Sequence, residues 1–219
     1  MNSMDKRYKN LRCWFSFSVF LVASIAMAQP NGYKPVVDEK AIKAKLDAIS
    51  KTITSIKSDF VQEKKLSVMN KRIMSKGKFL FKKENKLRLE YIEPFAYLMA
   101  VNKDKIYIKD EGKVSTYDGR SNKLFRQINV MILASIQGTG NNKDFQSAYY
   151  ENEKHYLLIL KPLTKSVNEM IKSLEIYLDK KDCSVSKFEM VEPTGDFTSI
   201  QLLTKEINVP IGDENFVLK

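Results

Sequence analysis

Catalysis by a nucleophile or a bound metal would require histidines, cysteines and carboxylates at defined spacings. His155 is the only histidine among the 219 residues, and it lies in an alternating run that is typical of a strand. The sequence has no G-x-S-x-G turn to present a nucleophilic serine. The two cysteines, Cys13 and Cys183, cannot supply the ligand spacing of a zinc site. We therefore predict that the protein is not an enzyme and holds no metal.

Nucleotide and nucleic-acid binding are not indicated either. Residues 138–140, Gly-Thr-Gly, follow a predicted helix rather than a strand, and the later glycine of a phosphate-binding loop is missing. Lysines and aromatic residues alternate around 78–83, a pattern that could stack on single-stranded nucleic acid. The export signal described next argues against that interpretation. We expect no cofactor and no nucleic-acid partner.

The N-terminus has the pattern of a cleaved secretory signal. Basic residues up to Arg12 precede an apolar run over 13–23, and Ala26-Met27-Ala28 follows. A membrane-spanning helix needs ~20 apolar residues, and this run is shorter. We predict cleavage after Ala28 and a periplasmic protein without a lipid anchor, because Cys13 precedes the apolar run. Loss of 1–28 would lower the net charge from +11 to 11 − 3 = +8.

After a tail over 29–37, the chain predicts an amphipathic helix that begins at Asp38 as its N-cap. Apolar residues follow at spacings of four and three, which places them on one stripe. These residues are Ile42, Leu46, Ile49, Ile53 and Ile56. The stripe is typical of a helix that packs on a core.

From Asp59 onward the hydrophobic period changes to two, and polar turns separate the short runs. In the second half we expect strands over 147–150, 155–161, 174–178, 185–191, 199–206 and 216–218. The fold class is therefore α+β, mainly β. The simplest topology is a meander of about ten antiparallel strands, a sheet that curls because strand twist accumulates. We expect one domain over 38–219.

One segment departs from this pattern and predicts a short helix. Asn129 is a suitable N-cap and Gly138 a suitable C′ residue, with almost only apolar side chains between them. Such a helix must be buried or must cover something apolar.

Four stretches, taken together, carry a resemblance to a known family. The first is Ser58-Asp59-Phe60-Val61-Gln62, directly after the helix, and the second is the strand pair over 77–83 and 87–94. The third is the hairpin over 101–118, and the fourth comprises 197–200, 207–210 and 216–218. In this order they resemble the LolA-like carriers of outer-membrane lipoproteins, over roughly residues 40–218.

The resemblance implies an incomplete, strongly curved antiparallel β-barrel whose helical lid covers an apolar cavity for acyl chains. It also implies that lipoproteins are received from an inner-membrane ABC release complex and passed to an outer-membrane acceptor. The arginine that helps to latch the lid in the family is replaced by Lys83, whose point charge lacks the planar guanidinium fork. Lys83 is therefore the latch candidate.

We expect the cavity to be lined by apolar residues of the strands and of the lid. The candidates are Phe60, Phe79, Phe81, Leu87, Leu89, Tyr91, Leu98, Ile106, Ile108, Leu158 and Ile176 from the strands, with Met131, Leu133 and Ile136 from the lid. We predict a monomeric carrier that touches membranes only transiently. Two alternatives remain open: a binder of another envelope lipid or lipid-linked pigment intermediate, and a periplasmic protein-interaction or signalling module.

Overall fold

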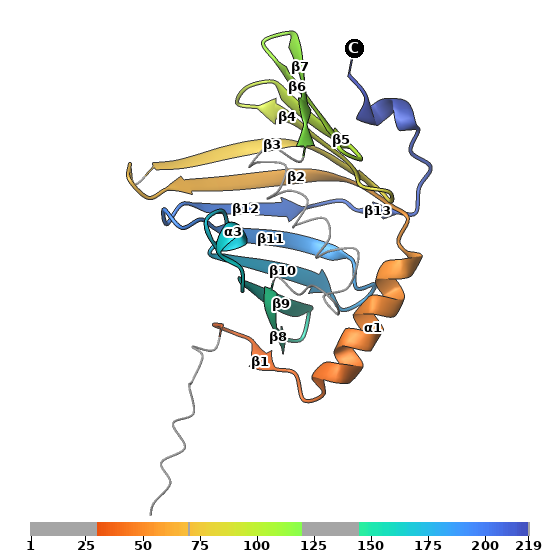
Figure 1. Cartoon of the computed structure of the whole chain (residues 1–219). Coiled ribbons are helices and arrows are strands. Elements are labelled where there is room, and N and C mark those ends of the chain that lie inside the picture. The colour runs from red at the N-terminus through yellow and green to blue at the C-terminus, as the bar shows by residue number, and fades with distance from the viewer. Residues whose placement is uncertain (1–29, 70, 120–144, 219) are drawn as a thin grey trace, which may run out of the picture.

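The computed structural model describes residues 30–69, 71–119 and 145–218 (Figure 1). The predicted signal over 1–28 and the predicted lid over 129–138 lie outside these residues. None of the helices in the described ranges has the length and apolar character needed to cross a membrane.

One antiparallel sheet of thirteen strands dominates the described residues. Its strands are β1 (Lys34–Pro35), β2 (Ser55–Leu66), β3 (Lys71–Lys82), β4 (Lys86–Glu93), β5 (Tyr97–Asn102), β6 (Lys105–Asp110), β7 (Lys113–Asp118), β8 (Phe145–Glu151), β9 (His155–Pro162), β10 (Ser173–Asp179), β11 (Val185–Val191), β12 (Phe197–Leu202) and β13 (Glu206–Ile207). The helices are α1 (Glu39–Thr52), the short α3 (Lys165–Asn168) and the 3-10 helix η3 (Asp213–Phe216).

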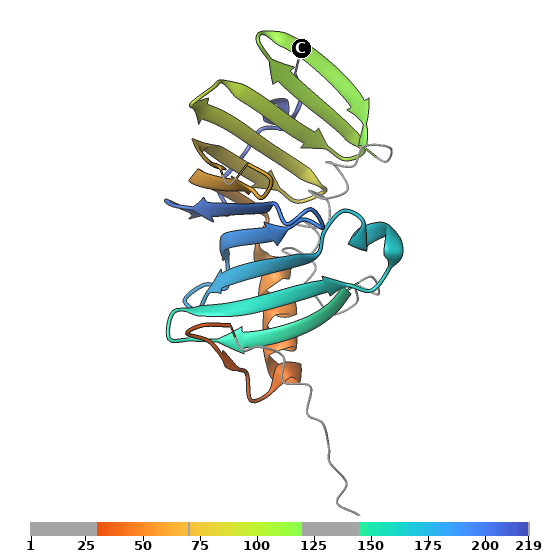
Figure 2. The same ribbon diagram turned by 90° about the vertical axis from the view of Figure 1, so that its left-hand side faces the viewer.

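The sheet consists of two meanders that meet at its centre. Its order is β1-β8-β9-β10-β11-β12-β2-β3-β4-β5-β6-β7, and β13 pairs with β2. The prediction of one continuous meander is therefore wrong, because β8 pairs with β1 and β9 rather than with β7. The sheet twists from β8 to β7 and stays open (Figure 2). The predicted incomplete, curved antiparallel barrel is confirmed.

Helix α1 begins as the sequence predicts but ends earlier. The Asp38 carboxylate accepts a hydrogen bond from the Ala41 amide at 2.9 Å, which satisfies one free N–H group of the first turn. The helix ends at Thr52, so Ile53 and Ile56 lie beyond it, Ile56 in β2. Asn208 fixes this junction, because its side chain accepts from the Thr54 amide at 2.7 Å and donates to the Thr52 carbonyl at 3.1 Å.

Five of the six strands expected in the second half are present, one with its expected bounds and the others with ends shifted by one to four residues. The exception is 216–218, where η3 ends at Phe216 instead of a strand beginning there. Phe216 is fully buried, and η3 lies against β4 and β5. Burial of the aromatic ring, rather than strand pairing, therefore accounts for the apolar residue at this position.

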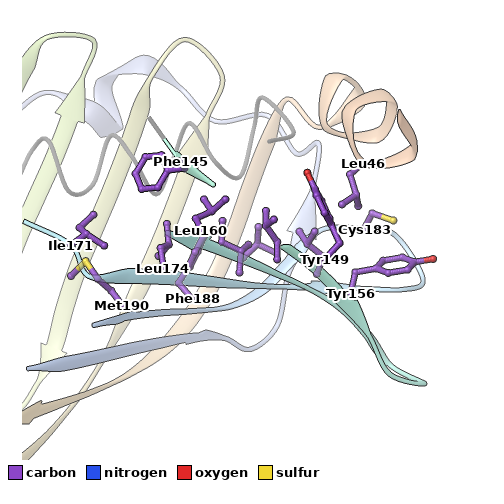
Figure 3. Packing of buried hydrophobic residues seen from close by; sticks show 14 of the residues in the cluster. Leu46, Phe145, Tyr149, Tyr156, Leu160, Ile171, Leu174, Cys183, Phe188 and Met190 are labelled. Carbon is purple, nitrogen blue, oxygen red and sulfur yellow. The ribbon is translucent and has the colours of Figure 1, made fainter. Parts of the chain in front are cut away.

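Two apolar clusters lie on one face of the sheet, which we call the apolar face. Residues directly opposite each other in neighbouring strands lie on the same face, and Phe188 pairs with both Ile176 and Ile200. The helix-covered cluster lies beneath α1, where Leu46 points toward Tyr149 and Cys183 (Figure 3). The strand cluster comprises Ile56, Phe60, Phe79, Phe81, Leu87, Leu89, Met99, Val101, Ile106, Ile200 and Leu202.

Candidate functional site

The strand cluster brings together most of the residues predicted to line a cavity. Its members come from β2, β3, β4, β5, β6 and β12, and the register aligns them in rows across the sheet. In one row Phe79 pairs with Leu89, Leu89 with Met99 and Met99 with Ile108. Tyr91, Tyr97 and Ile108 are partly buried and pack against the cluster. The result is one uncharged apolar surface that crosses six strands.

No helical residue in the described part of the chain belongs to the strand cluster. The neighbouring cluster differs, because Ile42, Leu46 and Ile49 of α1 pack into it. Leu158 and Ile176, both predicted to line the cavity, pair with each other in this helix-covered cluster. They share the apolar face with the other candidates but lie on its α1 side.

Leu98 does not share this face. It pairs with Glu90 and Lys109, whereas its chain neighbour Met99 points to the apolar side, because successive side chains of a strand alternate. Residues 97–101 are apolar at every position. Their hydrophobic pattern therefore could not show which side chains point to which face of the sheet. Sequence reasoning consequently missed Met99 and Val101, which are both buried in the strand cluster.

Gly77 allows three aromatic rings to pack at the centre of the site. It pairs with Phe60 and with Tyr91. The Phe60 and Tyr91 rings meet edge to face with centroids 5.1 Å apart, and the Tyr97 ring follows at 5.8 Å from Tyr91. A Cβ atom at Gly77 would lie 2.8 Å from the Phe60 ring and would also collide with the Glu90 carbonyl oxygen. This position therefore requires glycine.

The Tyr91 hydroxyl is a polar group within this apolar surface. It donates a hydrogen bond to the Gln62 side-chain oxygen at 2.8 Å. Burial raises the pKa of Tyr91 to about 12, because removal from water disfavours the phenolate. The hydroxyl is therefore neutral at physiological pH, and the surface can take up apolar groups without a charge having to be desolvated.

Lys83, the latch candidate, contacts the end of α1. Its ammonium group donates to the Lys51 carbonyl oxygen in the last helical turn, and its amide donates to the Thr54 carbonyl at 2.8 Å. A cation at a helix C-terminus satisfies free carbonyl groups and complements the helix dipole. The lid candidates Met131, Leu133 and Ile136 lie outside the described residues, so a contact between Lys83 and the lid stays a prediction.

Ser184 and Lys205 bring a hydroxyl and an amine together in the described ranges. Ser184 accepts a hydrogen bond from the Lys205 ammonium at 2.6 Å, an arrangement in which lysine could act as a base. Ser184 is 0% exposed, however, and a substrate could not reach its hydroxyl without local opening. Burial lowers the pKa of His155. The described residues contain no group of three metal-ligating side chains.

Comparison with known proteins agrees with this geometry. The model of one protein family, described as outer membrane lipoprotein carrier protein LolA, matches residues 51–219. The chain belongs to the LolA family. The resemblance found in the sequence is thereby confirmed, and at the level of this family the function is the binding of lipoprotein or lipid cargo in the cell envelope. No curated protein matches the sequence.

Several solved structures are similar to this LolA family member. MucB matches with a TM-score of 0.50 and 11% identity, over 83% of this chain and 64% of MucB. A LolA superfamily protein from Nitrosomonas europaea matches with a TM-score of 0.45 and 9% identity, over 84% and 99% of the two chains. The lipoprotein LppX from Mycobacterium tuberculosis matches with a TM-score of 0.41 and 9% identity, over 80% of this chain and 99% of LppX. The MucB identity is too low to show more than the fold.

Proposed function

We propose that this protein binds the acyl chains of lipoproteins on its strand cluster and carries them through the periplasm from the inner to the outer membrane. The carrier has no catalytic step, and its N-terminal segment directs its export. The strand cluster carries the proposal, because it is an uncharged apolar layer to which no helix of the described ranges contributes. Its members are 1–8% exposed in this structure, so acyl chains would reach them after a local opening.

The free energy of acyl-chain transfer explains why such a surface is needed. Burial of one CH₂ group contributes ~0.8 kcal/mol, so an acyl chain of ordinary length resists entry into water by on the order of 10 kcal/mol. An apolar protein surface lowers this barrier by replacing water around the chain. The neutral Tyr91–Gln62 pair adds hydrogen-bonding capacity without adding charge.

Family membership supports the direction of transport and the partners. An inner-membrane ABC release complex would deliver the lipoprotein, and an outer-membrane acceptor would remove it from the carrier. Both partners follow from the family resemblance. We also propose that the carrier is a monomer.

Paired substitutions in β6 test the proposed surface. Ile108 and Tyr107 are neighbours, both partly buried, and they point to opposite faces of the sheet. We expect Ile108→Gln to weaken binding of a fluorescent fatty-acid probe by about ten-fold, since the loss of ~1.4 kcal/mol of apolar contact has this effect. Tyr107→Gln should change binding by less than about two-fold. Far-UV circular dichroism would establish that both variants are folded.

The native cargo is tested on wild-type protein purified after export. Mass spectrometry of bound material should find lipoprotein acyl chains. A free lipid or a lipid-linked pigment would instead assign the protein to another envelope lipid. A wild-type protein that binds neither probe nor lipid, but does bind a protein partner, would overturn the carrier function in favour of an interaction module.

A further inference from the structure

The tip of the β2–β3 hairpin, residues 67–69, exposes two adjacent apolar side chains. Val68 is 93% exposed and Met69 61%. Tight turns ordinarily carry Gly, Asn, Asp, Ser or Pro, whose side chains suit both the backbone and water. Apolar residues that are neighbours at a protruding tip therefore indicate a surface that contacts something other than water.

On the β3 side, this hairpin extends well beyond β4 (Figure 1). Pairing of β2 with β3 continues to Leu66 and Lys71, whereas β4 joins β3 only from Lys76 onward. The five residue-to-residue steps from Lys71 to Lys76 correspond to ~16 Å of extended strand. The hairpin tip is therefore free to meet a large flat surface before β4 or β5 can reach it.

Hydrogen bonds hold the hairpin tip in this position. The Ser67 hydroxyl donates to the Thr194 carbonyl at 2.9 Å, and the Ser67 amide donates to the Asp196 carboxylate at 2.9 Å. Both acceptors lie in the turn between β11 and β12, which supports the hairpin from its other side. Val68 directly follows this anchored serine, so its exposed position is defined by the fold.

Cations surround the base of the hairpin tip. Residues 63–76 contain five Lys or Arg and one Glu, a net charge of 5 − 1 = +4. We call Lys64, Lys65, Lys71 and Arg72 the basic collar. Arg72 pairs with Glu63 at 3.1 Å and Lys64 lies 3.9 Å from Glu192. In the described part of the chain, Lys65 and Lys71 take part in no ion pair.

We propose that the hairpin tip docks on an anionic lipid bilayer. Val68 and Met69 enter the boundary between headgroups and acyl chains, and the basic collar binds lipid phosphates. Apolar insertion and electrostatic attraction add in such contacts, and each Lys or Arg near the surface contributes to the attraction. The collar has cations on both strands of the hairpin, which suits a surface that offers phosphates on every side.

This docking goes beyond the proposed carrier function and does not require cargo. Vesicles of phosphatidylglycerol and of phosphatidylcholine, mixed with protein purified after export, test it directly. The only natural tryptophan is Trp14, so Met69→Trp and Val37→Trp can each report on one site. Val37 is 98% exposed and lies between β1 and α1, which makes it the matched control.

With phosphatidylglycerol vesicles, the emission of Met69→Trp should shift to shorter wavelength and should be quenched by brominated lipid. The emission of Val37→Trp should not change. Co-sedimentation of V68E/M69E with these vesicles should be weaker than that of wild type by at least about ten-fold. The control V37E/L203E, which also places two carboxylates at exposed apolar positions, should bind like wild type. Phosphatidylcholine vesicles and added salt should both weaken binding.

Equal sedimentation of V68E/M69E and wild type would overturn the docking site. So would a Met69→Trp emission that vesicles leave unchanged, or a wild-type protein that binds no vesicles, in which case the hairpin tip would contact a protein. These results are independent of the fatty-acid probe assay, so either proposal can fail while the other stands.

Discussion

The substitution Gly77→Ala tests whether close packing of the aromatic rings shapes the apolar face. The new Cβ atom would lie 2.8 Å from two carbons of the Phe60 ring, whereas carbons in ordinary contact are ~3.5–4.0 Å apart. Phe60 is 1% exposed and cannot swing into water. On the other side the Cβ meets the Glu90 carbonyl oxygen, a backbone atom of β4.

Overpacking of a core costs ~1–3 kcal/mol, and we expect the upper end because part of the obstacle is backbone. For a chain of this length a loss of ~3 kcal/mol corresponds to a decrease of about 6–12 °C in Tm. Urea unfolding followed by far-UV circular dichroism would measure the change in free energy. The loss should be smaller in a Phe60→Leu background, which removes the ring contact but leaves the Glu90 contact.

Two results would refute this reasoning. One is a change in the free energy of unfolding below about 0.5 kcal/mol for Gly77→Ala, which is the range of neutral surface substitutions. The other is that Gly77→Ala lowers the free energy of unfolding equally with phenylalanine and with leucine at position 60. The effects of substitutions at two residues in contact should not be additive. Either result would mean that Phe60 can repack freely and that the site has no fixed shape.

Hydrogen bonds from Lys82 and Lys86 lower the pKa of Asp213 from 3.8 to about 2. Because the folded-state pKa is depressed, this contribution to stability is present above pH ~4 and is lost as the pH falls toward 2. Asp213→Asn should therefore have a lower free energy of unfolding than wild type at pH 7. In urea unfolding, the free energies of the two proteins should converge as the pH falls from 4 to 2. A difference that persists at pH 2 would exclude the ion pairs as its cause. Lys83→Met should lower the free energy of unfolding by at most about 1 kcal/mol through the lost bond to the Lys51 carbonyl. Lys78 is exposed, so Lys78→Met serves as the control in thermal unfolding. Equal changes in Tm for the two variants would contradict a specific role for Lys83.

Local patterns predicted the individual elements well. The strand over 185–191 was predicted with its correct bounds, because apolar and polar residues alternate between clear turns. The end of α1 was not predicted correctly, because Ile53 and Ile56 continue the helical spacing past Thr52. A hydrogen-bond partner more than 150 positions away, Asn208, holds that junction. No window of neighbouring residues contains this information.

The candidate site was predictable to a similar extent. Leu87 and Leu89 alternate with charged residues, and that pattern placed them on one face of their strand. Leu98 could not be placed, because η3 and the apolar face bury both sides of β5 and every position from 97 to 101 is apolar. The proximity of Ile200 to Phe188 on one side and to β2 on the other follows from the strand order. Strand order is a tertiary property that periodicity does not encode.

Pairing of β12 with β2 has a consequence for the order of folding. Leu202 lies opposite Phe60, so the middle of the sheet forms between segments that are more than half the chain apart. Until β12 arrives, β2 has an open backbone edge that can recruit strands of other molecules. Contacts of such long range also form slowly, because a long loop must close first. Truncation before residue 197 would consequently divide the sheet at its centre, even though the missing residues stand near the end of the sequence.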